Sequence, residues 1–178
     1  VQTCALPIFD DRQPGGCVGQ PVHMPWVQIA ATAESQTKNT MRMVRAFAPK
    51  GSKVVDEYSL DPGVTIYYKP GGILEVITSS ATSAEGAEAS FVVGDETEHW
   101  KPSNGGPELA ATLADNLSKS GERMLETANA WKPGMDTVAE SSWDAWVAQE
   151  EGRLKDDAGR MLYDARLAPP DTDMADYG

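Results

Sequence analysis

Basic residues are scarce in this sequence. Its 178 residues include 15 Lys and Arg against 27 Asp and Glu, which gives a formal net charge of -12 at pH 7. A protein that coats nucleic acid through its whole surface needs clustered Lys and Arg, because the phosphates must be neutralised. The composition therefore excludes a simple basic module of that kind, while DNA contact through a small local patch stays open.

Cysteines and long apolar runs are scarce as well. The two cysteines, Cys4 and Cys17, form no C-x-x-C pair, so the sequence indicates neither a zinc site nor a disulfide framework. No apolar run approaches the roughly 20 residues of a membrane span, and no signal peptide is visible. With 40% hydrophobic and 24% charged residues, the composition is typical of a globular protein without membrane attachment.

A phosphate-binding loop is missing too. No G-x-x-x-x-G-K-[ST] segment occurs, and residues 48–53 (APKGSK), which lack a Gly-Lys pair, are interpreted as the end of a helix. The chain does not begin with Met, and residues 1–8 (VQTCALPI) resemble a translated sequencing-library adapter. We therefore expect residues 1–8 to be an artefact and the segment that should precede Phe9 to be absent.

What the chain does contain is an alternation of strand and helix patterns. Apolar runs predict strands at residues 26–32 (WVQIAAT), 91–96 (FVVGDE) and 123–131 (RMLETANAW), and residues 65–80 predict a hairpin around Pro-Gly-Gly. Helices are predicted directly after the first strand, between Pro107 and Gly121 with a leucine at every fourth position, and around residues 138–147. The alternation predicts an α/β fold with a mostly parallel sheet and flanking helices.

Three other segments complete this organisation. Residues 9–25 are rich in Gly, Pro and Asp and predict a loop. Residues 161–168 (MLYDARLA) predict a last strand, and residues 169–178 predict an exposed tail or linker.

The predicted strand at residues 91–96 ends in two adjacent carboxylates, Asp95 and Glu96. Ligands of parallel α/β sheets bind where strands end. Mg²⁺ prefers hard oxygen ligands and keeps several waters, so one Asp on a rigid strand end gives it enough protein support. A neighbouring Glu can orient and deprotonate the water that attacks a nucleotide phosphate. We interpret the pair as a Walker B element, although many buried strands end in acidic turns.

Four segments resemble, in family order, the large terminase subunit of tailed bacteriophages, especially phages of actinobacteria. They are residues 26–42 (WVQIAATAESQTKNTMR), 77–100 (ITSSATSAEGAEASFVVGDETEHW), 123–134 (RMLETANAWKPG) and 162–173 (LYDARLAPPDTD). The family is a DNA-packaging motor with an N-terminal ATPase domain and a C-terminal nuclease domain. The resemblance implies a P-loop NTPase-like fold of the ASCE type. Residues 9–168 would be part of the ATPase domain without its phosphate-loop strand, and residues 169–178 a linker toward the nuclease domain.

The resemblance also implies roles for individual residues. Asp95 matches the acid that holds Mg²⁺ through water, and Glu96 matches the catalytic glutamate. Thr127, Ala128 and Asn129 match the coupling motif, a strand end that senses the nucleotide and passes the change to DNA-gripping parts. ATP and Mg²⁺ are the implied cofactors. The implied partners are double-stranded phage DNA, the portal protein, the small terminase subunit and further copies in a ring, in the host cytoplasm.

Alternative interpretations remain open for the whole chain and for single residues. One is a non-catalytic α/β phage protein that binds a partner, and another is a metal-dependent nuclease that uses Glu75, Asp95, Glu96 and Asp115. Gln36, just after the first strand, either contacts a nucleotide base or is an ordinary first-turn residue. Three further groups have structural interpretations: Glu98 and His99 as a solvated turn, Trp143 and Trp146 as a packed helical face, and Lys38, Arg42 and Arg45 as a solvated surface.

Overall fold

The computed structural model describes residues 7–9, 17–19, 24–68, 71–79, 87–154 and 161–166, the first two ranges as backbone only. The chain forms two compact units, Val1–Glu140 and Ser141–Gly178. Most of the suspected adapter segment and the whole of the linker predicted over residues 169–178 lie outside the described residues. In the part of the chain that is described, no helix is both long and apolar enough to cross a membrane.

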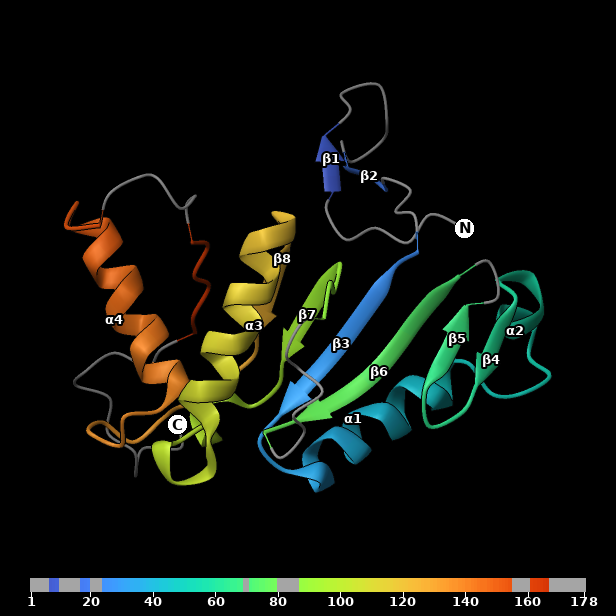
Figure 1. The fold of residues 1–178 in the computed structure, drawn as a ribbon, viewed down its shortest axis with the longest axis horizontal. Coiled ribbons are helices and arrows are strands. Elements are labelled where there is room, and N and C mark those ends of the chain that lie inside the picture. The colour runs from blue at the N-terminus through green and yellow to red at the C-terminus, as the bar shows by residue number, and fades with distance from the viewer. Residues whose placement is uncertain are drawn as a thin grey trace, which may run out of the picture. The chain divides into compact units, whose positions relative to one another are not determined.

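The first unit contains a six-stranded sheet with the strand order β4-β5-β6-β3-β7-β8 (Figure 1). Its strands are β3 (Trp26–Ala31), β4 (Leu60–Pro62), β5 (Ile66–Tyr68), β6 (Gly72–Thr78), β7 (Phe91–Gly94) and β8 (Arg123–Glu126). The four strands β6, β3, β7 and β8 run parallel, whereas β4 and β5 add two antiparallel strands at one end. The predicted α/β fold with a mostly parallel sheet is confirmed, as is the hairpin, which β5 and β6 form.

The strand register brings the ends of the parallel strands to one edge of the sheet. Ala30 of β3 pairs with Gly94 of β7, and Gly94 in turn pairs with Glu126 of β8. The residues that follow Gly94 and Glu126 therefore leave the sheet side by side. The six strands pair contiguously, so a further strand would have to join at an end of the sheet and not between its members.

Helices cover both faces of the sheet. Successive side chains of β3 point to opposite faces: Ile29 packs with Met41 of α1 (Glu34–Phe47), and Ala30 belongs to the cluster formed with Leu113 of α3 (Gly106–Ser120). The short α2 (Lys53–Glu57) lies against β4. Two 3₁₀ turns, η2 (Thr97–His99) and η3 (Pro102–Asn104), connect β7 to α3, and α4 (Val138–Glu150) follows β8.

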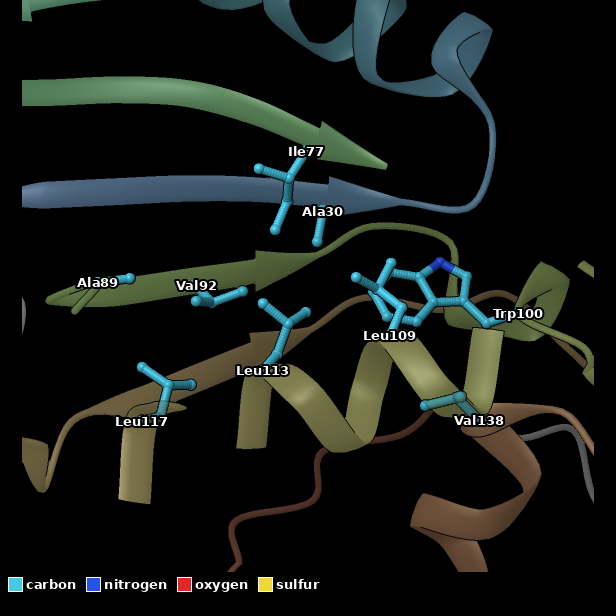
Figure 2. Packing of buried hydrophobic residues seen from close by; sticks show 9 residues of the cluster. All are labelled: Ala30, Ile77, Ala89, Val92, Trp100, Leu109, Leu113, Leu117 and Val138. Atoms are coloured by element: carbon cyan, nitrogen blue, oxygen red, sulfur yellow. The ribbon is translucent and has the colours of Figure 1, made fainter. Parts of the chain in front are cut away.

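The larger core lies between the sheet and α3, and Trp100 is its biggest fully buried side chain. Figure 2 shows Trp100 beside Leu109, with Leu113 and Leu117 following along α3. The predicted leucine stripe is therefore confirmed. A Cβ on Gly106 would lie 2.4 Å from the carbonyl carbon of Trp100, so only glycine allows α3 to begin this close to the tryptophan.

Two segments differ from the sequence prediction. The predicted loop over residues 9–25 contains β2 (Cys17–Gly19), which pairs with β1 (Pro7–Phe9), because a short apolar stretch there finds an antiparallel partner. The strand predicted at residues 161–168 is not formed in residues 161–166. There the backbone of Met161 exchanges hydrogen bonds with the side chain of Gln149 in place of a neighbouring strand.

The second unit is organised around three aromatic rings. Trp143 and Trp146 of α4 lie 5.0 Å apart between ring centroids, and Tyr163 packs against both at 5.5 and 5.2 Å. The two tryptophans thus form a packed helical face, as the sequence predicted. Tyr163 meets Trp143 edge-on, an arrangement that aromatic pairs favour.

Glu140 stabilises the turn that begins α4 and gives it a dependence on pH. Its carboxylate accepts hydrogen bonds from the backbone N–H of Gly134 at 2.6 Å and of Asp136 at 2.9 Å. The bond from Gly134 contributes most to holding the pKa of Glu140 below its ordinary value. A lowered folded pKa means that this stabilisation is present above the ordinary pKa and is lost as the pH falls through the folded pKa.

We therefore expect an NMR titration to find the midpoint of the Glu140 carboxyl below the ordinary value for a glutamate. Glu140→Gln should make thermal stability less sensitive to acid in that same range of pH. A Glu140 midpoint at or above the ordinary value for a glutamate would contradict the hydrogen-bonded turn.

Candidate functional site

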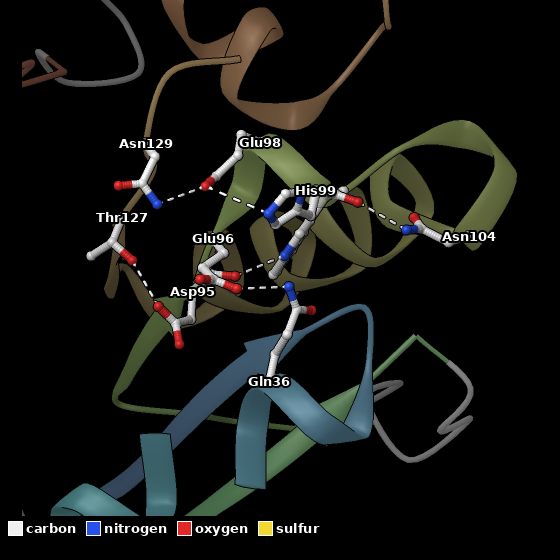
Figure 3. Close-up of polar contacts among 9 residues, drawn as sticks. Gln36, Asp95, Glu96, Glu98, His99, Asn104, Thr127 and Asn129 are labelled. Carbon is white, nitrogen blue, oxygen red and sulfur yellow. Dashed lines mark hydrogen bonds and ion pairs between the residues drawn. The ribbon is translucent and has the colours of Figure 1, made fainter. Parts of the chain in front are cut away.

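Polar side chains gather where β7 and β8 end and α1 begins (Figure 3). The sheet hydrogen bonding continues one residue past each strand: Asp95 N–H donates to Ala30 O at 2.9 Å, and Thr127 N–H donates to Gly94 O at 2.9 Å. Thr97 N–H then donates to Thr127 O at 3.0 Å. The chain segments that leave the two strands are thus held against each other by their backbones.

Asp95 is held by two threonines from different elements. Its Oδ1 accepts a hydrogen bond from Thr127 Oγ1 at 3.0 Å, and its Oδ2 accepts one from Thr40 Oγ1 of α1 at 2.5 Å. A carboxylate has about four lone-pair sites, so both oxygens retain capacity for another donor or a hydrated cation. The two side-chain partners of Asp95 are hydroxyl oxygens, and hard oxygens of this kind suit Mg²⁺.

Glu96 follows in a left-handed backbone conformation, with φ 53° and ψ 53°. Non-glycine residues rarely adopt this conformation, and such residues cluster at functional sites. Two contacts hold it: Gln36 Nε2 donates to Glu96 Oε2 at 2.8 Å, and His99 N–H donates to Glu96 O at 2.9 Å. The indole N–H of the buried Trp100 donates to Asp95 O at 3.0 Å, which anchors the same turn in the core.

Hydrogen bonds join all of the predicted site residues except Ala128. Gln36, Asp95, Glu96, Thr127 and Asn129 are connected by the hydrogen bonds of this region (Figure 3). Ala128 lies exposed between Thr127 and Asn129, and its methyl group forms none of these bonds. The structure thus brings Gln36 to the acidic strand end, where its amide contacts a carboxylate.

Two residues of this region were not predicted. Thr40 lies one helical turn after Gln36. That spacing puts both residues on one face of α1, and it was the sequence feature that could have indicated Thr40. Glu98 was interpreted as part of a solvated turn, which is wrong for its side chain. Glu98 is only 6% exposed, and Asn129 Nδ2, from the segment after β8, donates to its Oε1 at 2.9 Å. His99, in contrast, is largely exposed.

The cluster of the nuclease alternative does not assemble. Glu75 accepts hydrogen bonds from Trp26 Nε1 and Gln28 Nε2, and Gln28 pairs with Val92, three residues before Asp95. At about 3.3 Å per residue, this lies about 10 Å from the strand end. Asp115 is exposed on α3. Within the described ranges, no group of three or more His, Cys, Asp or Glu is arranged to hold a metal ion.

The basic residues of α1 make surface contacts. Lys38 Nζ lies 2.9 Å from the carboxylate of Glu34, and Arg45 donates to the carbonyl of Gly63 at 3.1 Å. Arg42 is exposed. Exposed ion pairs of this kind contribute little to stability, so a solvated surface remains the interpretation.

Comparison with known proteins finds phage relatives. The chain is 37% identical over 169 residues to the Gene 13 protein of Mycobacterium phage L5, covering 91% of this chain and 28% of the relative. It is 36% identical over 175 residues to the Gene 13 protein of Mycobacterium phage D29, covering 94% of this chain and 28% of the relative. The chain thus spans about 28% of the length of these relatives. No protein-family model matches it.

A solved structure has the same fold. The large terminase of bacteriophage HK97 superposes with a TM-score of 0.66 at 10% sequence identity, covering 87% of this chain and 31% of the terminase. The fold of the chain is therefore that of a part of a phage large terminase.

Proposed function

We propose that this chain carries the catalytic carboxylates of the ATPase that drives DNA packaging in a phage large terminase. One observation carries the proposal: Asp95 and Glu96 follow β7, a parallel strand paired on both sides, and each is held by side chains of other elements. The terminase-like fold and the four resembling segments support the same conclusion.

Each residue has a role that follows from its contacts. Asp95 would hold Mg²⁺ through water, and Thr40 and Thr127 orient its carboxylate. Glu96 accepts a proton from the attacking water, and Gln36 fixes the direction of the Glu96 carboxylate. Bound Mg²⁺ supplies positive charge that offsets the charge developing on the phosphates. Gln36 is thereby assigned to positioning Glu96 and not to binding a nucleotide base.

The proposal includes a longer protein around this chain. The relatives, which are more than three times as long as the matched part, support it. Residues 9–168 would belong to the ATPase domain, residues 169–178 would lead toward a nuclease domain, and residues 1–8 would be foreign. Thr127, Ala128 and Asn129 would couple hydrolysis to movement of double-stranded DNA. The portal protein, the small subunit and further copies in a ring would be the partners, in the host cytoplasm.

The test is hydrolysis by the intact protein that contains this chain. We expect ATP hydrolysis that requires Mg²⁺, stops when a chelator removes the ion and returns when the ion is restored. Residues 9–178 alone should be inactive, because they supply no phosphate-binding loop. An intact protein that neither binds nor hydrolyses ATP, with or without DNA, would contradict the proposal and favour the partner-binding alternative.

A further inference from the structure

Glu98 is a buried carboxylate with few partners. Its residue is 6% exposed, its Oε1 accepts one hydrogen bond from Asn129 Nδ2 at 2.9 Å, and His99 Nε2 lies 3.8 Å from the same oxygen. Among the described residues, Glu98 Oε2 is buried and has no hydrogen-bond partner. Burying a charged group is costly unless it is well paired, so stability alone does not explain a glutamate here.

The position of Glu98 connects two parts of the candidate site. It lies in η2, the turn whose first backbone bond, His99 N–H to Glu96 O, also holds Glu96. Its partner Asn129 lies beyond β8, two residues after Thr127, which contacts Asp95. The Glu98–Asn129 pair therefore ties the turn of Glu96 to the segment that leaves β8.

The two sides of this pair differ in their access to solvent. Glu98 is buried, whereas Asn129 is exposed and can be displaced by movement of its segment. His99, also exposed, lies near the same Glu98 oxygen but beyond hydrogen-bond distance, at 3.8 Å. Within the part of the chain that the structure describes, Asn129 is thus the one hydrogen-bond donor to this buried carboxylate. Movement of its segment would switch the turn between a bonded and an unbonded state, which is what coupling between sites requires.

We propose that Glu98 is a positioning residue that links the hydrolysis site to the segment after β8. Withdrawal of Asn129 releases η2 and shifts the Glu96 carboxylate, and a shift of Glu96 moves Asn129 in return. The inference rests on the proposed ATPase function for its consequences, whereas the Glu98–Asn129 hydrogen bond on which it is built is seen in this chain.

The sharpest test exchanges the donor and the acceptor. Asn129→Asp sets two carboxylates against each other, and we expect kcat of the intact protein to fall roughly tenfold with little change in the KM for ATP, a size usual for coupled neighbours. Glu98→Gln combined with Asn129→Asp restores one amide and one carboxylate with the original total charge. This double variant should recover most of the lost kcat and the wild-type amount of DNA packaged per ATP.

A second measurement does not depend on ATPase activity. Hydrogen exchange of the backbone amides of Thr97 and His99 should be faster in Asn129→Asp and return toward wild type in the double variant, because both amides are bonded within the linked turns. Asn39→Asp, the same change at an exposed position of α1, is the matched control and should alter neither exchange nor turnover.

The outcomes separate the two proposals. Absence of Mg²⁺-dependent hydrolysis in the wild-type protein would contradict the proposed function, and the exchange data would still decide whether the link exists. A double variant no better than Asn129→Asp in either measurement would overturn the link. If the loss of kcat in Asn129→Asp came together with a raised KM for ATP and a lowered unfolding temperature, Asn129 would have only a structural role. That result would also overturn the link.

Discussion

Glu96→Gln is expected to reduce ATP turnover of the intact protein by about 10²–10⁴-fold, the usual contribution of a positioned general base. The amide oxygen of the replacement can still accept the hydrogen bond from Gln36 Nε2, which now spans 2.8 Å. The geometry of the site should therefore persist while the basic carboxylate is lost. Nucleotide affinity should stay close to wild type, because Asp95 and its threonine partners are unchanged.

The measurement is steady-state hydrolysis together with equilibrium binding of ATP. Glu57→Gln is the matched control, since Glu57 is exposed on α2, away from the site, and should leave turnover unchanged. Turnover in Glu96→Gln equal to that of the control would remove Glu96 from the chemistry.

Trp100→Ala is expected to lower the free energy of unfolding by about 3–5 kcal/mol, the range for truncating a large buried aromatic residue. Trp100 is fully buried and packs where α3 begins. The change leaves a cavity and also removes the hydrogen bond from the indole N–H to Asp95 O. Because domains are stable by only ~5–15 kcal/mol, a loss of this size brings the protein near its unfolding threshold.

Chemical denaturation of the intact protein, followed by the signal of this domain, measures the change. Phe47→Ala serves as the control, because Phe47 is 80% exposed and its truncation should alter stability by less than about 0.5 kcal/mol. Similar losses for the two variants would show that Trp100 does not anchor the core.

Local patterns were sufficient for the elements with strong periodicity. The stripe of Leu109, Leu113 and Leu117 predicted α3, and the apolar runs predicted β3 and β7, because these residues face the core that the structure describes. β4 was not predicted, since three residues that include Pro62 carry no alternation and pair only because β5 lies beside them. Strand order likewise depends on contacts between distant segments. The upstream phosphate-loop strand stays a prediction, and contiguous pairing leaves it a place beside β4 or β8.

Sequence patterns could identify those site residues that stand at the ends of strands. Asp95 and Glu96 were found from an apolar run that stops in carboxylates. Thr127, Ala128 and Asn129 were found as the end of the next predicted strand, and the resemblance gave them their role. Glu98 was not predicted, because its immediate neighbours in sequence are polar. Its partner Asn129 lies about thirty positions later, and no local window of sequence shows such a contact. Periodicity could place Thr40 on α1 but could not show that its hydroxyl meets Asp95.

The left-handed backbone of Glu96 sets stability and activity against each other at one position. Side chains other than glycine lose roughly 1–2 kcal/mol in this conformation, so glycine there would relax the turn after β7. The same substitution would remove the carboxylate that Gln36 holds over the strand end. Stabilisation of the fold by design or by selection for thermal resistance would thus favour loss of the proposed catalytic base, a trade-off built into the geometry of a single residue.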